Sequence, residues 1–163
     1  MVAQIKNHNL HSLNYLKFFF TKLITTFFYI GYLPLIPGTF GSIAGVFIYT
    51  LIKENPYLLI LIGSFITILG FLLTSKAAKL FNRRDPPQIV IDEISGMLIS
   101  FLGIPGDKLT LLIGFIIFRI LDATKPYPTN RLHRLGGSLG IMGDDIIAGI
   151  YTNFTLRLIF LLL

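Results

Sequence analysis

The sequence predicts an all-α membrane protein, a compact bundle of about six helices with roughly four of them spanning or inserted into the bilayer. The first observation is composition, because 53% of the residues are hydrophobic and only 13% are charged, against about 25% charged in soluble domains. The mean hydropathy of +0.74 agrees with this. The second is that the apolar residues form long runs rich in Leu, Ile and Phe, and an open sheet edge cannot lie in lipid.

Tyr57 to Ser75 is the clearest predicted span. Its nineteen residues carry no charge, and about 20 apolar residues cross the ~30 Å of bilayer hydrocarbon. Four shorter or interrupted apolar runs complete the bundle: Leu23 to Ile52, with a break near Pro34 and Pro37, and then Gln88 to Ile104, Leu109 to Leu121 and Ile146 to Leu163.

The basic residues indicate the orientation. Lys76, Lys79, Arg83 and Arg84 follow the clearest span directly, and such clusters stay on the cytoplasmic side. Alternating the loops from that point predicts a multi-pass protein whose basic loops face the cytoplasm. We expect an amphipathic or flexible N-terminal segment over residues 1–30 and a single helical domain over residues 31–163.

Several function classes are excluded or disfavoured. The chain has no cysteine, which excludes a disulfide framework and a zinc–thiolate site. The net charge of +6 is spread over short loops between apolar runs, which is typical of contact with anionic lipid headgroups. We therefore expect membrane lipid, and no nucleic acid, as a partner.

The acidic residues predict a site. Five of the eight acids lie at or inside the ends of apolar runs, where a carboxylate costs at least about 2.5 kcal/mol at the bilayer centre. The predicted topology brings all five to the cytoplasmic face, where they would repel one another unless cations neutralise them. Mg²⁺ prefers such oxygen ligands. Helix capping is the alternative for any single acid; for the whole set we favour a metal site. The five are Asp92, Glu93, Asp122, Asp144 and Asp145.

Glycines follow both acidic pairs by one helical turn. Asp92 and Gly96 are four residues apart, as are Asp145 and Gly149, so each pair shares a helix face. Glycine at that position lets another helix approach closely. The acid-bearing faces are therefore predicted to point into the bundle.

Two segments are candidates for binding phosphate. The stretch from Pro37 to Ser42, PGTFGS, is predicted to be a turn that starts a helix, where free backbone N–H groups bind anions; an ordinary helix cap explains it equally well. The second segment is FRILDATKPYP, in which Arg119 and Asp122 are spaced for an ion pair. Lys125, before Pro126, is the better phosphate ligand. The predicted phosphate-binding residues are Thr39, Gly41, Ser42, Arg119 and Lys125.

Four blocks in this order closely resemble the phosphatidylglycerophosphatase A family: YLPLIPGTFGS, DPPQIVIDEISG, FRILDATKPYP and GIMGDDIIAGIY. The resemblance covers roughly Gly31 to Tyr151, and Gly143 is a departure from the larger residue expected there. It implies an all-helical bundle in the bacterial cytoplasmic membrane and Mg²⁺-dependent hydrolysis of phosphatidylglycerophosphate to phosphatidylglycerol and phosphate. The family motifs carry over onto Asp92, Glu93, Asp122, Lys125, Asp144 and Asp145 as catalytic residues, with Asp85 and Arg119 also matching.

The mechanism expected from these residues is metal-assisted hydrolysis of a phosphomonoester. Asp92, Glu93, Asp144 and Asp145 would hold Mg²⁺, Lys125 would neutralise the phosphate, and Asp122 would orient or deprotonate water. A covalent aspartyl-phosphate remains open beside direct attack by water. The alternative from another class is a cation transporter or channel whose acids line a pathway.

Overall fold

The computed structural model describes residues 15–162, without the side chains of Asn130 and His133. Of the segment expected over residues 1–30, residues 1–14 therefore lie outside the described part, whereas residues 15–25 are helical. Within the described residues the fold is all-helical, as predicted. The elements that follow are η1 (Ile30–Tyr32), α2 (Pro37–Ile52), α3 (Pro56–Leu80), α4 (Ile91–Ser100), α5 (Lys108–Thr124), α6 (Thr129–Leu135) and α7 (Gly137–Leu162).

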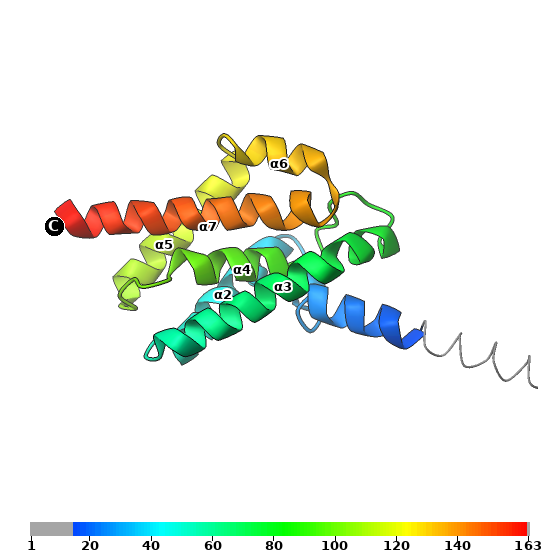
Figure 1. The fold of residues 1–163 in the computed structure, drawn as a ribbon, viewed down its shortest axis with the longest axis horizontal. Helices are drawn as coiled ribbons and strands as arrows, with labels where there is room; N and C mark the ends of the chain where they lie inside the picture. Colours follow the sequence, from blue (N-terminus) through cyan, green and yellow to red (C-terminus); the bar gives the residue numbers. More distant parts are fainter. Residues whose placement is uncertain (1–14, 163) are drawn as a thin grey trace, which may run out of the picture.

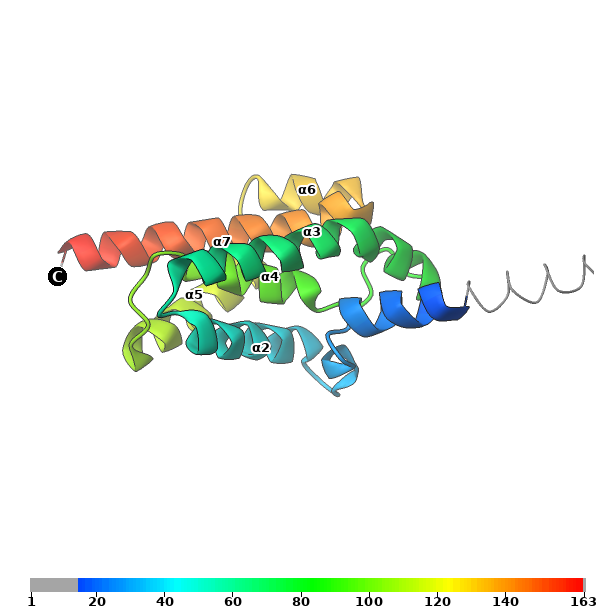
Figure 2. The ribbon, with the colours of Figure 1, turned by 60° about the horizontal axis from the view of Figure 1, so that its bottom comes forward.

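The short helix α4 lies at the centre of the bundle (Figures 1 and 2). It packs against α2, α3, α5 and α7, and eight of its ten residues are buried. The apolar character of the run from Gln88 to Ile104 therefore reflects burial within the protein. A ten-residue helix is about 15 Å long, which is half the thickness of the hydrocarbon layer.

Two helices are long and apolar enough to cross a membrane. They are α3, with a hydropathy of 2.4 over its best window, and α7, with a hydropathy of 1.4; only 17% and 28% of these windows are buried inside the protein. The nineteen-residue run that predicts a span lies wholly within α3. Of the other helices, α2 is apolar but shorter. The four spanning or inserted helices expected from the sequence are thus reduced to two candidates among the described residues.

Glycines allow α4 and α7 to approach closely, as their spacing predicts. A Cβ atom added at Gly96 would lie 2.7 Å from the backbone oxygen of Asp145. One added at Gly149 would collide with the backbone oxygen of Gly96. The two helices therefore touch through their backbones just beyond the acidic residues, and this contact sets the distance between Asp92 and Asp145.

Two helix starts differ from the sequence prediction. The motif PGTFGS is the first turn of α2, with Pro37 at the first helical position, rather than a turn before the helix; proline is favoured there because its fixed φ suits the helix. Helix α7 begins at Gly137, well before Asp144. Asp144 and Asp145 therefore lie more than one turn inside α7, which removes the helix-capping explanation for that pair.

We predict that Gly149→Val destabilises the protein by about 1–3 kcal/mol, the usual effect of overpacking, because its side chain would strike the backbone of α4. Gly63→Ala in α3 is the matched control, since its added Cβ would meet only Leu98, at 3.9 Å. Thermal unfolding of purified protein in detergent measures both. Equal unfolding temperatures for Gly149→Val and the wild type would contradict the backbone contact.

Candidate active site

Three carboxylates meet where α4 begins beside α7. Asp92 and Glu93 occupy the first turn of α4, and Asp145 comes from α7. One oxygen atom from each lies within 4.8 Å of the other two. Asp92 and Asp145 are only 5% and 4% exposed. We call these three residues the acidic triad.

The acidic triad offers oxygen atoms that the described residues leave unsatisfied. Oδ1 of Asp92, Oε2 of Glu93 and Oδ1 of Asp145 are buried without a hydrogen-bond partner in the described part of the chain. Burying a charged oxygen in this way is unfavourable unless a cation or donor compensates it. Clustered carboxylate oxygens are the ligands that hard divalent cations prefer, so these residues fit such an ion.

The electrostatics at the start of α4 reflect burial and the mutual repulsion of the acids. Burial raises the pKa of Asp92 well above its ordinary value, and the nearby charges of Glu93 and Asp145 raise it further. Burial also raises the pKa of Glu93 to about 7, although its hydrogen bond with Asp92 opposes the shift. The protein alone therefore disfavours full ionisation of this cluster.

Asp144 takes a different partner from its neighbour. Its Oδ2 forms an ion pair with Nζ of Lys125, the residue that caps the end of α5 in a left-handed conformation with φ of 44°. Adjacent residues of a helix point about 100° apart, which separates Asp144 from Asp145. Burial lowers the pKa of Lys125, but the bond and charge of Asp144 and the charges of Asp85 and Asp122 outweigh it and raise the pKa overall.

Arg119 and Asp122 form the ion pair that their spacing predicts. Nη1 of Arg119 lies 2.8 Å from Oδ2 of Asp122 and donates a second hydrogen bond of 3.3 Å to Oγ of Ser42. Asp122 belongs to the last turn of α5, where the helix dipole disfavours negative charge. Arg119 offsets that cost and fixes the direction of the carboxylate.

The start of α2 packs against the acidic triad. A Cβ atom at Gly38 would collide with Oε1 of Glu93, and one at Gly41 would lie 2.8 Å from Cβ of Val90. The hydroxyl of Ser42 donates to the backbone oxygen of Gly38. The backbone N–H of Thr39 bonds to Ile36. These contacts place the predicted phosphate-binding residues of α2 behind the triad, and their role in binding phosphate stays a prediction.

A cavity of about 300 Å³ joins these groups. It brings together all six residues predicted to be catalytic, but none of Thr39, Gly41, Ser42 and Arg119 lines it. Asp85, which the family motif matched without a defined role, also lines it. The sequence prediction left out the uncharged wall residues, and the DPP motif was the available signal for Pro86 and Pro87. The full lining is Asp85, Pro86, Pro87, Ile89, Asp92, Glu93, Asp122, Ala123, Lys125, Ile141, Asp144 and Asp145.

The profile of one protein family, phosphatidylglycerophosphatase A, matches residues 23–160. The chain belongs to this family. It is therefore a phosphoric monoester hydrolase, and the match gives no support to the cation-transporter alternative.

Curated relatives agree with this assignment. Phosphatidylglycerophosphatase A of Escherichia coli strain K12 is 37% identical over 74% of this chain and 72% of its own length. The enzyme of the same name from Haemophilus influenzae is 34% identical over 71% and 73%. A Bacteroides thetaiotaomicron protein named "Putative phosphatidylinositol-3-phosphatase" is 32% identical over 82% and 89%. No solved structure matches the chain significantly.

We predict that Glu93→Gln stabilises the cation-free protein at neutral and alkaline pH, because it removes one carboxylate from the acidic triad. The gain should grow as the pH rises from 4.5, the ordinary value of this pKa, through about 7, its value in the folded protein. In that range the unfolded residue is ionised while the folded one still holds its proton, so wild-type stability falls as the pH rises. Thermal unfolding in EDTA measures this, with about 2–4 °C expected per kcal/mol.

Glu54→Gln is the control for this measurement, since the Glu54 side chain is 91% exposed. It should leave the unfolding temperature unchanged. A Glu93→Gln protein that unfolds at a lower temperature than the wild type in EDTA at pH 8 would contradict the repulsion among the carboxylates of the acidic triad.

Proposed function

We propose that this protein is a Mg²⁺-dependent phosphatidylglycerophosphatase of the bacterial cytoplasmic membrane, which hydrolyses phosphatidylglycerophosphate to phosphatidylglycerol and inorganic phosphate. The observation that carries the proposal is the cavity in which the acidic triad faces Lys125 and Asp122. It combines oxygen ligands for a cation with a cationic side chain for phosphate in one chain of the matching family.

The acidic triad would hold Mg²⁺, which supplies a charge that polarises the phosphate and lowers the pKa of a bound water. Three carboxylates with unsatisfied buried oxygens are a suitable donor set. The sequence prediction also assigned Asp144 to the metal. Its ion pair with Lys125 supports a different role, in which Asp144 holds that lysine in place.

Lys125 would bind the non-bridging oxygens of the substrate phosphate. Lys125 lines the same cavity as the acids that would hold the cation. A phosphate group entering the cavity can accept a hydrogen bond from the ammonium of Lys125, whose three N–H groups are all donors. Stabilisation of developing charge by such a preorganised donor is among the largest contributions to catalysis.

Asp122 would orient or deprotonate the attacking water. Its carboxylate is only 16% exposed, lines the cavity and is fixed by Arg119 at 2.8 Å. Arg119 thus acts through Asp122. A carboxylate held in this way is a suitable general base when it is within hydrogen-bond reach of the water.

The arrangement of charge and apolar surface supports the proposed membrane location. Helix α3 presents a mostly unburied apolar surface and ends beside Lys76, Lys79, Arg83 and Arg84, which favours the cytoplasmic side for that end. A separate cavity at this end of α3 is lined by Lys79, Arg83 and Arg84 and by Gly137, the first residue of α7. The active site would therefore open at the depth of the cytoplasmic headgroups.

The relatives differ in the lipid headgroup that their names specify. Two relatives are named for phosphatidylglycerophosphate, whereas the Bacteroides relative is named for a phosphoinositide. Both headgroups end in a phosphomonoester that the same cavity could accept. We propose phosphatidylglycerophosphate because the family profile and both enzymes of that name agree.

Release of inorganic phosphate by the purified protein tests the proposal. With Mg²⁺, we expect phosphatidylglycerophosphate to be hydrolysed faster than phosphatidylinositol 3-phosphate, and EDTA to abolish the reaction. Asp92→Asn should lower kcat by roughly 100-fold or more, since it removes one member of a preorganised charged site.

Asp107→Asn is the matched control. Asp107 caps the N-terminus of α5, away from the cavity, and asparagine caps a helix as well as aspartate does, so full activity is expected. Full activity of Asp92→Asn in EDTA would overturn the site. Preference for phosphatidylinositol 3-phosphate would overturn the substrate but leave the site intact.

A further inference from the structure

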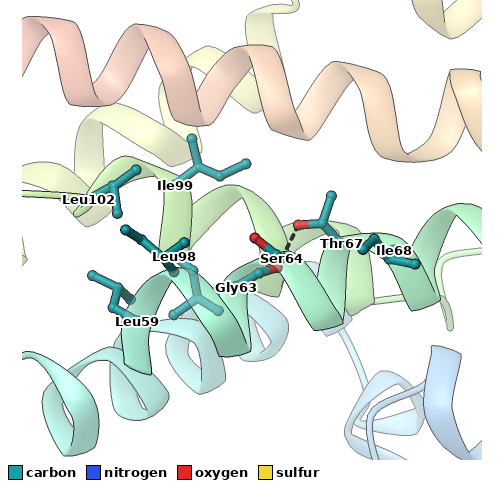
Figure 3. A pocket seen from close by; sticks show the side chains of 9 residues that line it. Leu59, Gly63, Ser64, Thr67, Ile68, Leu98, Ile99 and Leu102 are labelled. Atoms are coloured by element: carbon teal, nitrogen blue, oxygen red, sulfur yellow. Dashed lines mark hydrogen bonds between the residues drawn. The ribbon is translucent and has the colours of Figure 1, made fainter. Parts of the chain in front are cut away.

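A second cavity lies between α3 and α4, away from the acids. It has a volume of about 370 Å³, and Figure 3 shows its side chains lining the space between the two helices. We call it the apolar groove. Its main walls are Leu59, Gly63, Thr67, Leu98, Ile99 and Leu102.

The hydroxyl of Thr67, in the wall of the apolar groove, is already hydrogen-bonded. Oγ1 of Thr67 donates to the backbone oxygen of Gly63 at 2.8 Å; both residues are labelled in Figure 3. The same Oγ1 lies 2.6 Å from Oγ of Ser95. An ordered water needs two to four polar partners, and this bonding leaves few. The groove therefore suits an apolar occupant.

The rim of the groove continues into an exposed apolar surface. Ile60 and Ile68 line the groove and are 53% and 58% exposed, and Leu61 beside them is 66% exposed. All three belong to α3, whose best window has a hydropathy of 2.4 and is 17% buried. The groove is thus a recess in the lipid-facing surface of the candidate span.

Helix α4 links the groove to the active site. Ile99 lies seven residues after Asp92, two turns along the same face of the helix, and Ser95 between them faces α3 through its bond to Thr67. At 1.5 Å per residue, Ile99 is about 10 Å deeper than Asp92. A headgroup layer is about 5–8 Å thick, half the difference between the whole bilayer and its hydrocarbon core. With the acids at headgroup depth, the groove lies in the acyl-chain region of the bilayer.

We propose that the apolar groove holds one acyl chain of the phospholipid substrate while its phosphate occupies the acidic cavity. This inference rests on the proposed function, since it assumes a lipid phosphate as the substrate. The groove would raise the affinity for long-chain lipid and hold the headgroup in register with Asp92. It takes no part in the chemical step.

Gly63 allows a direct test. A Cβ atom added there would meet only Cβ of Leu98, at 3.9 Å, so Gly63→Leu can fill the groove without a clash at its base. We expect KM for long-chain phosphatidylglycerophosphate in mixed micelles to rise about tenfold, the effect of displacing about two methylene groups. The kcat value should not change. For a water-soluble analogue with very short acyl chains, KM should stay within about twofold of wild type.

Leu61→Phe is the matched control, because it adds bulk to the exposed face of α3 outside the groove. It should leave both KM values unchanged. Activity on the short-chain substrate also shows whether Gly63→Leu is folded. Gly63→Ala, which occupies less of the groove, should give a smaller rise in the KM for the long-chain substrate.

Each of the remaining outcomes would contradict the binding of a substrate acyl chain in the groove. Equal kinetics of Gly63→Leu and wild type on long-chain substrate would show that bulk lipid alone covers the groove. Equal losses on both substrates, or equal effects of Leu61→Phe, would show a general effect on structure. A change in oligomeric state on Gly63→Leu would show that a second copy covers the groove. Wild type that releases phosphate from neither substrate would overturn the proposed function itself.

Discussion

Asp92, Glu93 and Asp145 bring three carboxylate oxygens within 4.8 Å of one another inside a helical bundle, where uncompensated negative charge is strongly unfavourable. Such a cluster persists only if the rest of the fold holds it in place and something positive completes it. Two basic residues near the cluster form ion pairs with other acids, Lys125 with Asp144 and Arg119 with Asp122. The unsatisfied oxygens of the acidic triad are therefore the feature from which our account of catalysis follows.

Several packing contacts of the fold hold this cluster in place. The backbone contact of Gly96 with Gly149 brings α4 and α7 together just beyond the acids. The glycines at the start of α2 leave room for the side chain of Glu93. Helix α4 is short and buried on nearly every side, so it can hold charged groups at one end while its other residues form the core. The longer helices α3 and α7 provide the apolar outer surface (Figure 1).

Sequence reasoning located the acids and the partner of Asp122, but not the partner of Asp144. The spacing of Asp92 with Gly96 and of Arg119 with Asp122 predicted real contacts, because helical periodicity decides which residues share a face. The start of α7 was misplaced because the glycine-rich stretch before Asp144 resembles a loop, whereas the break lies at Gly136 and Gly137, which have φ of 71° and 60°. The Lys125–Asp144 pair depends on a left-handed lysine, which no local pattern signals. Two helices of the described residues qualify as candidate spans, against the roughly four spanning or inserted helices expected, because a buried core helix such as α4 is as apolar as one in lipid.

Binding of Mn²⁺, followed by the loss of its free-ion electron paramagnetic resonance signal, tests the central claim most directly. The account predicts that wild-type protein binds Mn²⁺ and releases it to excess Mg²⁺, that Asp145→Asn greatly weakens binding, and that Asp107→Asn binds normally. Asp145 is the member of the acidic triad on α7, so its loss removes a ligand without altering α4. Wild-type protein that leaves the free Mn²⁺ signal unchanged, or Asp145→Asn that binds as tightly as wild type, would contradict the account.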